Sequence, residues 1–355
     1  MEEIISTVKQ FSRTETTKIF LFAKTINFRN INFEFVAQGA EGIVYKSGDI
    51  AIKFYKNTLV NQHKNELTFI KLANKLIDKN ISNNFVKLYD ATKLFGLNVL
   101  FLELVTGDME IWMQNKHSDI EWLQMLFQLL CGIMIIQNCM LMYHADLKPK
   151  NILYKTYEKP KLIKYIIDDK EFTITTNTIF KISDFGGAVT LLPNFINRIP
   201  QPAIKLSIEN NLDLKHLAML HIRLLSMMII QTYTLEEIIN FGKSSDHFND
   251  YVIKATKGVE ENRRKFKHPK EFANKRLAMA LSYYLVEHKY FNVDDLSNYS
   301  GTVNYLPSKT IINMFISLSY VKGRGSLLKK IIEIGNLINE KLTKCDEIYI
   351  LKCDI

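Results

Sequence analysis

The sequence has few of the residues that break regular structure and few of those that cross-link a chain. It holds 14 Gly, 7 Pro and 4 Cys among 355 residues, too few for a collagen-like chain, a low-complexity chain or a disulfide scaffold. The cysteines are also too widely spaced for a zinc site, so we expect free thiols in a reducing compartment. Few linkers are expected, and most of the chain should form helices and strands.

Membrane and export signals are also scarce. The first residues, MEEIISTVKQ, carry acids and no apolar core, so we expect no secretory leader and a cytoplasmic protein. No charged residue occurs between Glu121 and His144, a run long enough to cross a membrane. Glutamines interrupt this run and no hydrophobic anchors flank it, so we predict a helix buried in a large domain and no transmembrane segment.

Charge is plentiful and unevenly spread. Hydrophobic residues make up 47% and charged residues 23% of the chain, with a net charge of +9, which is ordinary globular composition. The most basic segment is 254–276, which contains nine Lys and Arg and three Glu. Such a segment can bind an acidic partner or nucleic acid. A solvated face of a helix and loop explains the same composition, and both readings stay open.

The hydrophobic pattern divides the chain into a β-rich part and a helical part. Short alternating runs between Asn32 and Tyr55 predict strands, the last two joined by a turn at Ser47-Gly48-Asp49. A helix is expected over 61–77, and strands over 85–89 and 98–105. We therefore predict an α+β protein with three parts: an N-terminal extension at 1–30, a small β-rich lobe at 31–105, and a larger, mainly helical lobe at 106–355.

Two features of the small lobe suggest a phosphate site. Gly39 and Gly42 lie between two predicted strands, where a turn without side chains lets the backbone approach a phosphate. Lys53 interrupts an apolar strand and needs a partner, which Glu66 on the following helix can supply. Each feature alone is weak evidence.

A stronger signal follows in HADLKPKNIL at 144–153 and KISDFG at 181–186. Phosphoryl transfer needs a carboxylate to orient and deprotonate the acceptor hydroxyl, a cation near the phosphate, and hard oxygen ligands for Mg²⁺ or Mn²⁺. The carboxylate can be that of Asp146, and the cation can be Lys148. The metal ligands can be Asn151 and Asp184. The ordered set predicts a phosphotransferase.

In these motifs the chain resembles the protein kinase superfamily, of the serine/threonine type, over roughly residues 32–230. The resemblance implies a two-lobed kinase-like fold with an αC helix in the small lobe, ATP with Mg²⁺ or Mn²⁺, and protein substrates with Ser or Thr acceptors. It makes Asp146 the catalytic base, Lys148 a phosphate-contacting lysine, and Asn151 and Asp184 the metal ligands. Asp213 matches a buried aspartate that braces the catalytic loop.

The resemblance also implies the nucleotide site. By the resemblance, its residues are Gly39, Gly42, Val44, Ala51, Lys53, Glu66, Leu102, Glu103, Val105 and Leu153. Within this set Leu102 matches the gatekeeper, and Glu103 and Val105 belong to the hinge that receives adenine. Val44, Ala51 and Leu153 would sandwich the adenine ring.

Departures from the family pattern carry information about control. Ala145 stands where an arginine usually precedes the catalytic aspartate, and its methyl group cannot pair with a phosphate. Thr190 is the acceptor in the short stretch after Gly186, so we predict activity without activation-loop phosphorylation, with Val189, Leu191 and Leu192 packing the loop. An insert at about 155–178 should form an extra hairpin. Such an insert is also similar to those of kinases encoded by large DNA viruses, which would place the enzyme in host cytoplasm or the virion.

Two alternatives stay open. A pseudokinase or scaffold would keep the fold without catalysis, although degenerate kinases usually lose at least one of the groups present here. A small-molecule kinase of the aminoglycoside or choline type shares the Asp-x-x-x-x-Asn loop and a later metal aspartate. Lys148-Pro149 and Asp184-Phe185-Gly186 favour protein substrates.

Overall fold

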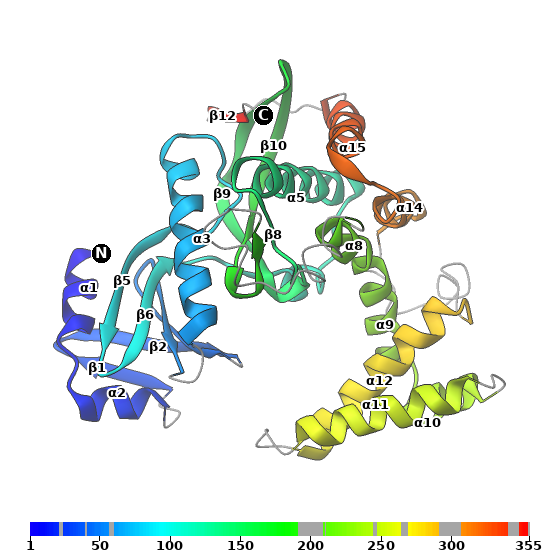
Figure 1. Ribbon diagram of the computed structural model, residues 1–355, viewed down its shortest axis with the longest axis horizontal. Helices are drawn as coiled ribbons and strands as arrows, with labels where there is room; N and C mark the ends of the chain where they lie inside the picture. The colour runs from blue at the N-terminus through cyan, green and yellow to red at the C-terminus, as the bar shows by residue number, and fades with distance from the viewer. Residues whose placement is uncertain are drawn as a thin grey trace. The chain divides into compact units, whose positions relative to one another are not determined.

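The structure is a computed structural model. It describes residues 1–20, 24–39, 41–56, 60–190, 209, 211–243, 247–263, 269–290, 307–339 and 348–353. The chain forms two compact units, and Figure 1 labels their elements. The first unit comprises Met1–Trp112, Leu123–Leu214 and Val321–Ile355, and the second comprises Met113–Trp122 and Lys215–Tyr320.

An antiparallel six-stranded sheet forms the beginning of the first unit. Its strands run in the spatial order β1-β2-β3-β4-β6-β5. Their bounds are β1 Thr25–Phe28, β2 Ile31–Gln38, β3 Gly42–Ser47, β4 Ile50–Tyr55, β5 Leu88–Leu94 and β6 Leu97–Glu103. The predicted turn between β3 and β4 is confirmed, and Gly48 has the positive φ of 53° that favours glycine.

The N-terminal extension is part of this sheet's core. Helices α1 (Glu2–Lys9) and α2 (Arg13–Phe20) precede β1. Phe11 is buried, and its ring packs edge-to-face on Phe28 and Phe33 at centroid distances of 5.1 and 5.2 Å. The extension's buried residues join one hydrophobic cluster with those of β3, β4 and β6; they are Val8, Phe11, Ile19 and Ile26.

Helix α3 (Val60–Asp78) follows β4, and a side chain of this helix is hydrogen-bonded to the first residue of β5 (Figure 1). The Asn74 side chain donates to the Leu88 carbonyl over 2.6 Å and accepts from the Leu88 N–H over 2.9 Å. The strand predicted at 85–89 begins later, at Leu88. Phe85 makes an isolated parallel bridge to Ile182 instead.

The predicted insert forms a long hairpin. Strand β9 (Ile152–Ile167) pairs with β10 (Lys170–Ile182) antiparallel. Asp168 and Asp169 make the turn with φ of 50° and 62°, and Asp is one of the residues that tolerate the left-handed region. Strand β12 (Ile348–Cys353) adds to β9 in parallel, and β7 (Gly107–Asp108) pairs with the start of β9.

Helix α5 (Asp119–Cys139) lies along this hairpin (Figure 1). By length and composition it can cross a membrane, but 83% of its most apolar window is buried inside the protein, as predicted for a core helix. Its glutamines bond the outer edge of β10. Gln124 donates to the Thr175 carbonyl over 2.7 Å, and Gln128 donates to that of Thr178 over 3.1 Å. Gln128 also accepts from the Phe180 N–H over 3.0 Å.

The remaining elements are short or helical. The short ones are α4 (Met109–Trp112), β8 (Met142–Tyr143), β11 (Val189–Thr190), and the 3-10 turns η1 (Pro149–Asn151) and η2 (Phe185–Gly187). The other helices are α8 (Leu212–Ala218), α9 (Leu220–Thr232), α10 (Leu235–Gly242), α11 (Phe248–Arg263), α12 (Pro269–Glu287), α14 (Lys309–Leu318) and α15 (Gly323–Asn339). Within the second unit, α9, α10, α11 and α12 share one hydrophobic cluster.

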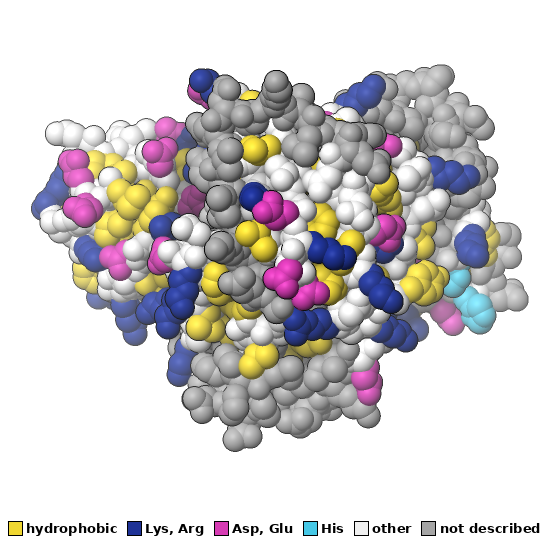
Figure 2. Space-filling view, turned by 90° about the horizontal axis from the view of Figure 1, so that it is seen from above, with side chains coloured by type: hydrophobic (Ala, Val, Ile, Leu, Met, Phe, Trp, Pro, Cys, Tyr) yellow, Lys and Arg dark blue, Asp and Glu magenta, His cyan; other side chains and the backbone are white. Residues whose placement is uncertain are grey.

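The basic segment 254–276 begins on α11 and continues on α12. The side chains of 261–269 lie outside the described residues. On the face drawn in Figure 2, basic side chains are interspersed with acidic ones and do not gather into one patch.

Candidate active site

Strand register places four of the predicted nucleotide-site residues on one face of the sheet. In antiparallel pairs, directly opposite residues point to the same side, and so do residues two apart on one strand. Val44 lies opposite Lys53, and Ala51 lies opposite Leu102. Ala51 and Lys53 are two apart on β4, so all four share a face. Each is partly exposed, as a surface that accepts a ligand requires.

Lys53 is the centre of an ion-pair cluster. Its Nζ lies 2.9 Å from Glu66 Oε2 on α3 and 3.8 Å from Asp184 Oδ1. Burial alone would lower the pKa of Lys53, but the Glu66 and Asp184 carboxylates outweigh it and hold the pKa above its ordinary value. Burial raises the pKa of Glu66 to about 7, although the Lys53 ammonium opposes this. The cluster joins β4, α3 and the segment at Asp184.

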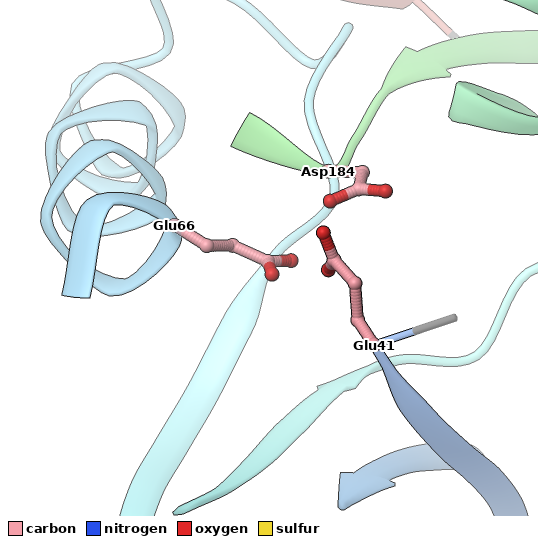
Figure 3. A group of neighbouring side chains, drawn as sticks. All are labelled: Glu41, Glu66 and Asp184. Atoms are coloured by element: carbon pink, nitrogen blue, oxygen red, sulfur yellow. The ribbon is translucent and has the colours of Figure 1, made fainter. Parts of the chain in front are cut away.

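A third carboxylate, that of Glu41, was not anticipated. Its Oε2 lies 3.5 Å from Lys53 Nζ. One oxygen from each of Glu41, Glu66 and Asp184 lies within 4.8 Å of the others, and Figure 3 shows these side chains pointing toward one another. The sequence signal was an acidic residue between two glycines beside a strand that carries a lysine.

The two glycines differ in what the structure demands of them. A Cβ on Gly42 would collide with the Phe54 carbonyl of β4, so only glycine allows these strands to pack this closely. A Cβ on Gly39 would meet nothing closer than 4.0 Å. The Gly39 N–H donates to the Gly42 carbonyl over 2.9 Å and closes the turn.

The loop before β9 holds the other chemical groups. Lys148 Nζ lies 2.6 Å from Asp146 Oδ2. The Asn151 amide donates to the same Asp146 oxygen over 3.0 Å and to the Asp146 carbonyl over 2.8 Å. Asn151 is buried, whereas Asp146 and Lys148 are partly exposed, at 49% and 37% of their side chains. The loop therefore exposes the Asp146 carboxylate and the Lys148 ammonium to solvent, while the buried Asn151 holds Asp146 in position.

Asp213 fixes the backbone of this loop. Its carboxylate is fully buried and accepts from the His144 N–H over 3.0 Å and from the Ala145 N–H over 2.9 Å. Ala145 has a φ of 62°, a conformation that costs a non-glycine residue about 1–3 kcal/mol and persists only where the surroundings impose it. His144 is buried, and its ring centroid lies 5.3 Å from that of Phe185.

Hydrogen bonds connect the loop to the segment at Asp184. The Asn151 carbonyl accepts from the Ser183 N–H over 3.0 Å and from its hydroxyl over 3.1 Å. His144 Nε2 bonds the Ser183 carbonyl over 2.8 Å. Asp184 follows with a φ of 64°. Asp184 therefore has a backbone fixed relative to Asp146.

The oxygens of Asn151 and Asp184 suit a hard divalent cation. The Asn151 Nδ2 atom donates to Asp146, which leaves its side-chain oxygen as the group available to a ligand. Asp184 Oδ1 is buried and accepts no hydrogen bond within the described part of the chain. Carboxylate and amide oxygens are the ligands that Mg²⁺ and Mn²⁺ prefer, so the donor set fits the predicted metal.

The hinge region contains a buried ion-pair triad. Glu103, at the end of β6, lies 2.9 Å from Lys181 Nζ and 3.1 Å from Lys155 Nζ. Lys181 also donates to the carbonyls of Asn83 and Phe85. Burial would raise the pKa of Glu103, but Lys181 and Lys155 outweigh it and hold the pKa below its ordinary value. The triad ties the hinge to both strands of the insert hairpin.

The predicted nucleotide site also includes residues beside this triad. Val105 and Leu153 are partly exposed. Leu153 pairs with Asp108 of β7 on one side and with Lys181 of β10 on the other. The segment after Asp184 is described as far as Thr190, which is buried and donates to the Leu141 carbonyl over 3.2 Å. Leu191 and Leu192 lie outside the described residues.

Known proteins similar to this chain include a protein kinase and a kinase domain. No family model matches the chain. The dual specificity protein kinase YAK1 of Saccharomyces cerevisiae is 27% identical over 149 residues, 38% of this chain and 18% of that kinase, so the chain spans under a fifth of its relative's length. A crystal structure of a kinase domain matches with a TM-score of 0.43 and 17% identity, covering 92% of this chain and 97% of that one. The ordered motifs and the geometry around Lys53 and Asp146 are similar to those of protein kinases, and the relative matched in sequence is a protein kinase. The fold of the chain is α+β.

Proposed function

We propose that the protein is an ATP-dependent protein kinase that transfers the γ-phosphate of ATP to Ser or Thr hydroxyls. One observation carries the proposal: Lys53 pairs with Glu66 and faces Asp184, whose segment is hydrogen-bonded to the loop of Asp146. Positioned charges of this kind are what phosphoryl transfer requires, because positioning and charge stabilisation supply most of its catalysis.

Each group then has a role. The Asp146 carboxylate orients the acceptor hydroxyl and takes its proton, and Lys148 stabilises the charge of the transferred phosphoryl group. Lys53 binds the α- and β-phosphates, and Asn151 and Asp184 would hold Mg²⁺ or Mn²⁺. When bound, the metal neutralises charge on the phosphates.

The rest of the nucleotide site follows from the shared face of the sheet. The adenine ring would lie between two surfaces, with Val44 and Ala51 on one side and Leu153 on the other. Leu102 would lie next to it. Backbone groups of the hinge at Glu103 and Val105 would bond its edge. Gly39 and Gly42 would let the loop cover the phosphates.

The two alternatives are weighed by the same geometry. A pseudokinase has no need of a complete set of charged groups, and here Lys53 and Glu66 pair while Asp146, Asn151 and Asp184 are linked by hydrogen bonds. A small-molecule kinase would use a similar centre. Its distinguishing feature is the acceptor, which the experiment below identifies.

The test is incubation with labelled ATP, Mg²⁺ or Mn²⁺, and generic acceptors such as casein and basic protein, with Asp146→Asn as the matched inactive variant. Phosphoserine or phosphothreonine on protein, lost in the variant, supports the proposal. Phosphotyrosine as well would extend it to dual specificity, the property in the name of the yeast relative. Label confined to small molecules, or no transfer by protein that binds nucleotide, would reject it.

Three further predictions accompany this function. We propose that the basic segment 254–276 binds an acidic partner or nucleic acid, which predicts binding that weakens steeply with salt. Charge reversal at Lys254 and Lys257 without effect on any binding would favour a solvated face. A cytoplasmic location and a similarity to kinases of large DNA viruses stay predictions.

A further inference from the structure

Glu41 occupies the phosphate side of the proposed nucleotide site, and neither the family pattern nor the mechanism above uses it. Its carboxylate contacts Lys53 at 3.5 Å, and 22% of its side chain is exposed. Glu66 already binds Lys53 more closely, at 2.9 Å. Glu41 is therefore not needed to neutralise the lysine.

The backbone holds Glu41 in this position. Its carbonyl accepts from the Lys56 N–H over 2.9 Å, and Gly42 is packed against Phe54. Glu41 thus lies immediately before β3, at the end of the turn that Gly39 closes. The side chain extends from this anchored point toward Glu66 and Asp184, as Figure 3 shows.

The charges in this cluster do not balance. One ammonium faces three carboxylates, which gives a formal excess of two negative charges when all are ionised. One oxygen of each carboxylate lies within 4.8 Å of the others, so their like charges repel one another. A polyphosphate entering this space would add further negative charge beside Glu41.

A divalent cation changes this balance. Metal bound at Asn151 and Asp184 would offset the carboxylates and the phosphates together, whereas a metal-free nucleotide would meet their repulsion. Like charges about 5 Å apart interact by about 3 kcal/mol at an effective dielectric constant of about 20. Repulsion of an unwanted ligand is an established way to obtain specificity.

We propose that Glu41 is a specificity-determining residue that makes nucleotide binding depend on a divalent cation by repelling metal-free nucleotide. The inference rests on the proposed function, because it assigns the ligand of that same site. Glu41 does this without binding the metal. Removing its charge should therefore strengthen metal-free binding and leave metal-dependent binding nearly unchanged.

The experiment is a titration of the full chain with fluorescent N-methylanthraniloyl-ADP, once with excess EDTA and once with excess Mg²⁺. Wild type is compared with Glu41→Gln, which keeps the shape and removes the charge. We expect the variant to bind metal-free nucleotide at least tenfold more tightly and the Mg²⁺ form within threefold of wild type. Glu34→Gln is the control, because Glu34 is 51% exposed and pairs with Lys46 on the neighbouring strand; its two affinities should equal those of wild type.

Three results would overturn the inference. Weaker Mg²⁺-nucleotide binding in Glu41→Gln would make Glu41 a metal ligand. An equal change with and without Mg²⁺ would leave the cation dependence unaltered and remove the specificity role. Wild-type protein that binds nucleotide in neither condition would reject the proposed function itself. Glu41→Ala, provided that its melting temperature is unchanged, must also bind metal-free nucleotide more tightly than wild type.

Discussion

Single carboxylates near the proposed phosphate site differ in their surroundings, and their roles should differ accordingly. Asp146→Asn keeps the bonds from Lys148 and Asn151 but removes the base. We expect turnover to fall about 10²- to 10⁴-fold with little change in Mg·ATP affinity. Asp184→Asn should abolish transfer too, but should weaken Mg·ATP binding more, because Asp184 is the proposed metal ligand.

These two variants are measured by steady-state kinetics and by nucleotide titration. The matched control is Asp169→Asn, in the exposed turn of the insert hairpin, where asparagine also tolerates the observed φ of 62°. It should behave as wild type. Residual turnover above about a tenth of wild type in Asp146→Asn would contradict the role of a general base.

Thr190 is the residue on which the absence of phosphorylation control can be tested. The residue is 1% exposed and its hydroxyl donates to the Leu141 carbonyl, so a kinase cannot reach it without local opening. Neither Thr190→Ala nor phosphatase treatment should change activity more than about twofold, because no charge-assisted pair of about 1.5–3 kcal/mol is lost. Thr190→Asp should lower the melting temperature, since it buries a charge.

Activity and melting temperature are both measured for the Thr190 variants and the phosphatase-treated protein, so that a loss of activity can be distinguished from a loss of stability. A tenfold loss after phosphatase treatment, with unchanged melting temperature, would show that another basic residue has taken the place of the arginine missing at Ala145.

At the scale of elements, the triad of Glu103, Lys181 and Lys155 joins the hinge to the insert hairpin. Glu103→Gln leaves Lys181, whose side chain is 6% exposed, without a buried counter-charge. Removing one member of a buried ion pair costs about 3–5 kcal/mol. We expect a loss of this order in the free energy of unfolding at pH 7, measured by urea denaturation.

The same variant should alter the pH dependence of stability. The pKa of Glu103 is lower in the folded protein than its ordinary 4.5, so its stabilising effect is complete above pH 4.5 and is lost as pH falls toward the folded pKa. The difference in the free energy of unfolding between wild type and Glu103→Gln should therefore become smaller as the pH falls. A difference that widens, or one that Glu34→Gln reproduces, would contradict the assignment.

The N-terminal extension is the second element with a measurable role. Phe11→Ala should destabilise the protein by about 3–5 kcal/mol, the usual cost of emptying a buried aromatic site, because Phe11 is 2% exposed in the core of the sheet. Phe95→Ala is the control, since Phe95 is 54% exposed. Thermal and urea denaturation that give equal losses for the two would show that the extension does not contribute to the core.

At the scale of the whole molecule, the sequence predicted what depends on local pattern. The hairpin turn at Gly48, the Lys53 and Glu66 pair, and the insert hairpin around Asp168 all follow from short-range periodicity and turn chemistry. Helix α5 was predicted as buried from its composition alone.

What the sequence did not predict depends on contacts between distant segments. The salt bridge of Lys155 to Glu103 spans 52 residues, and the bond of Lys9 to Asp90 spans 81. No local pattern marks such pairs. The bounds of the helices at 248–263 and 309–318, within the part predicted as mainly helical, were also not predicted. Glu41 was visible between its glycines, but its approach to Asp184 requires the fold.

The glutamines of α5 have a consequence for how copies of this chain behave toward one another. A long strand with an open edge is a template onto which another chain can add, and unprotected edges of this kind lead to aggregation. Gln124 and Gln128 occupy part of the β10 edge as an adjacent strand would. We therefore expect their amides to protect this edge, and Gln128→Leu to form more intermolecular β-structure than wild type at the same protein concentration.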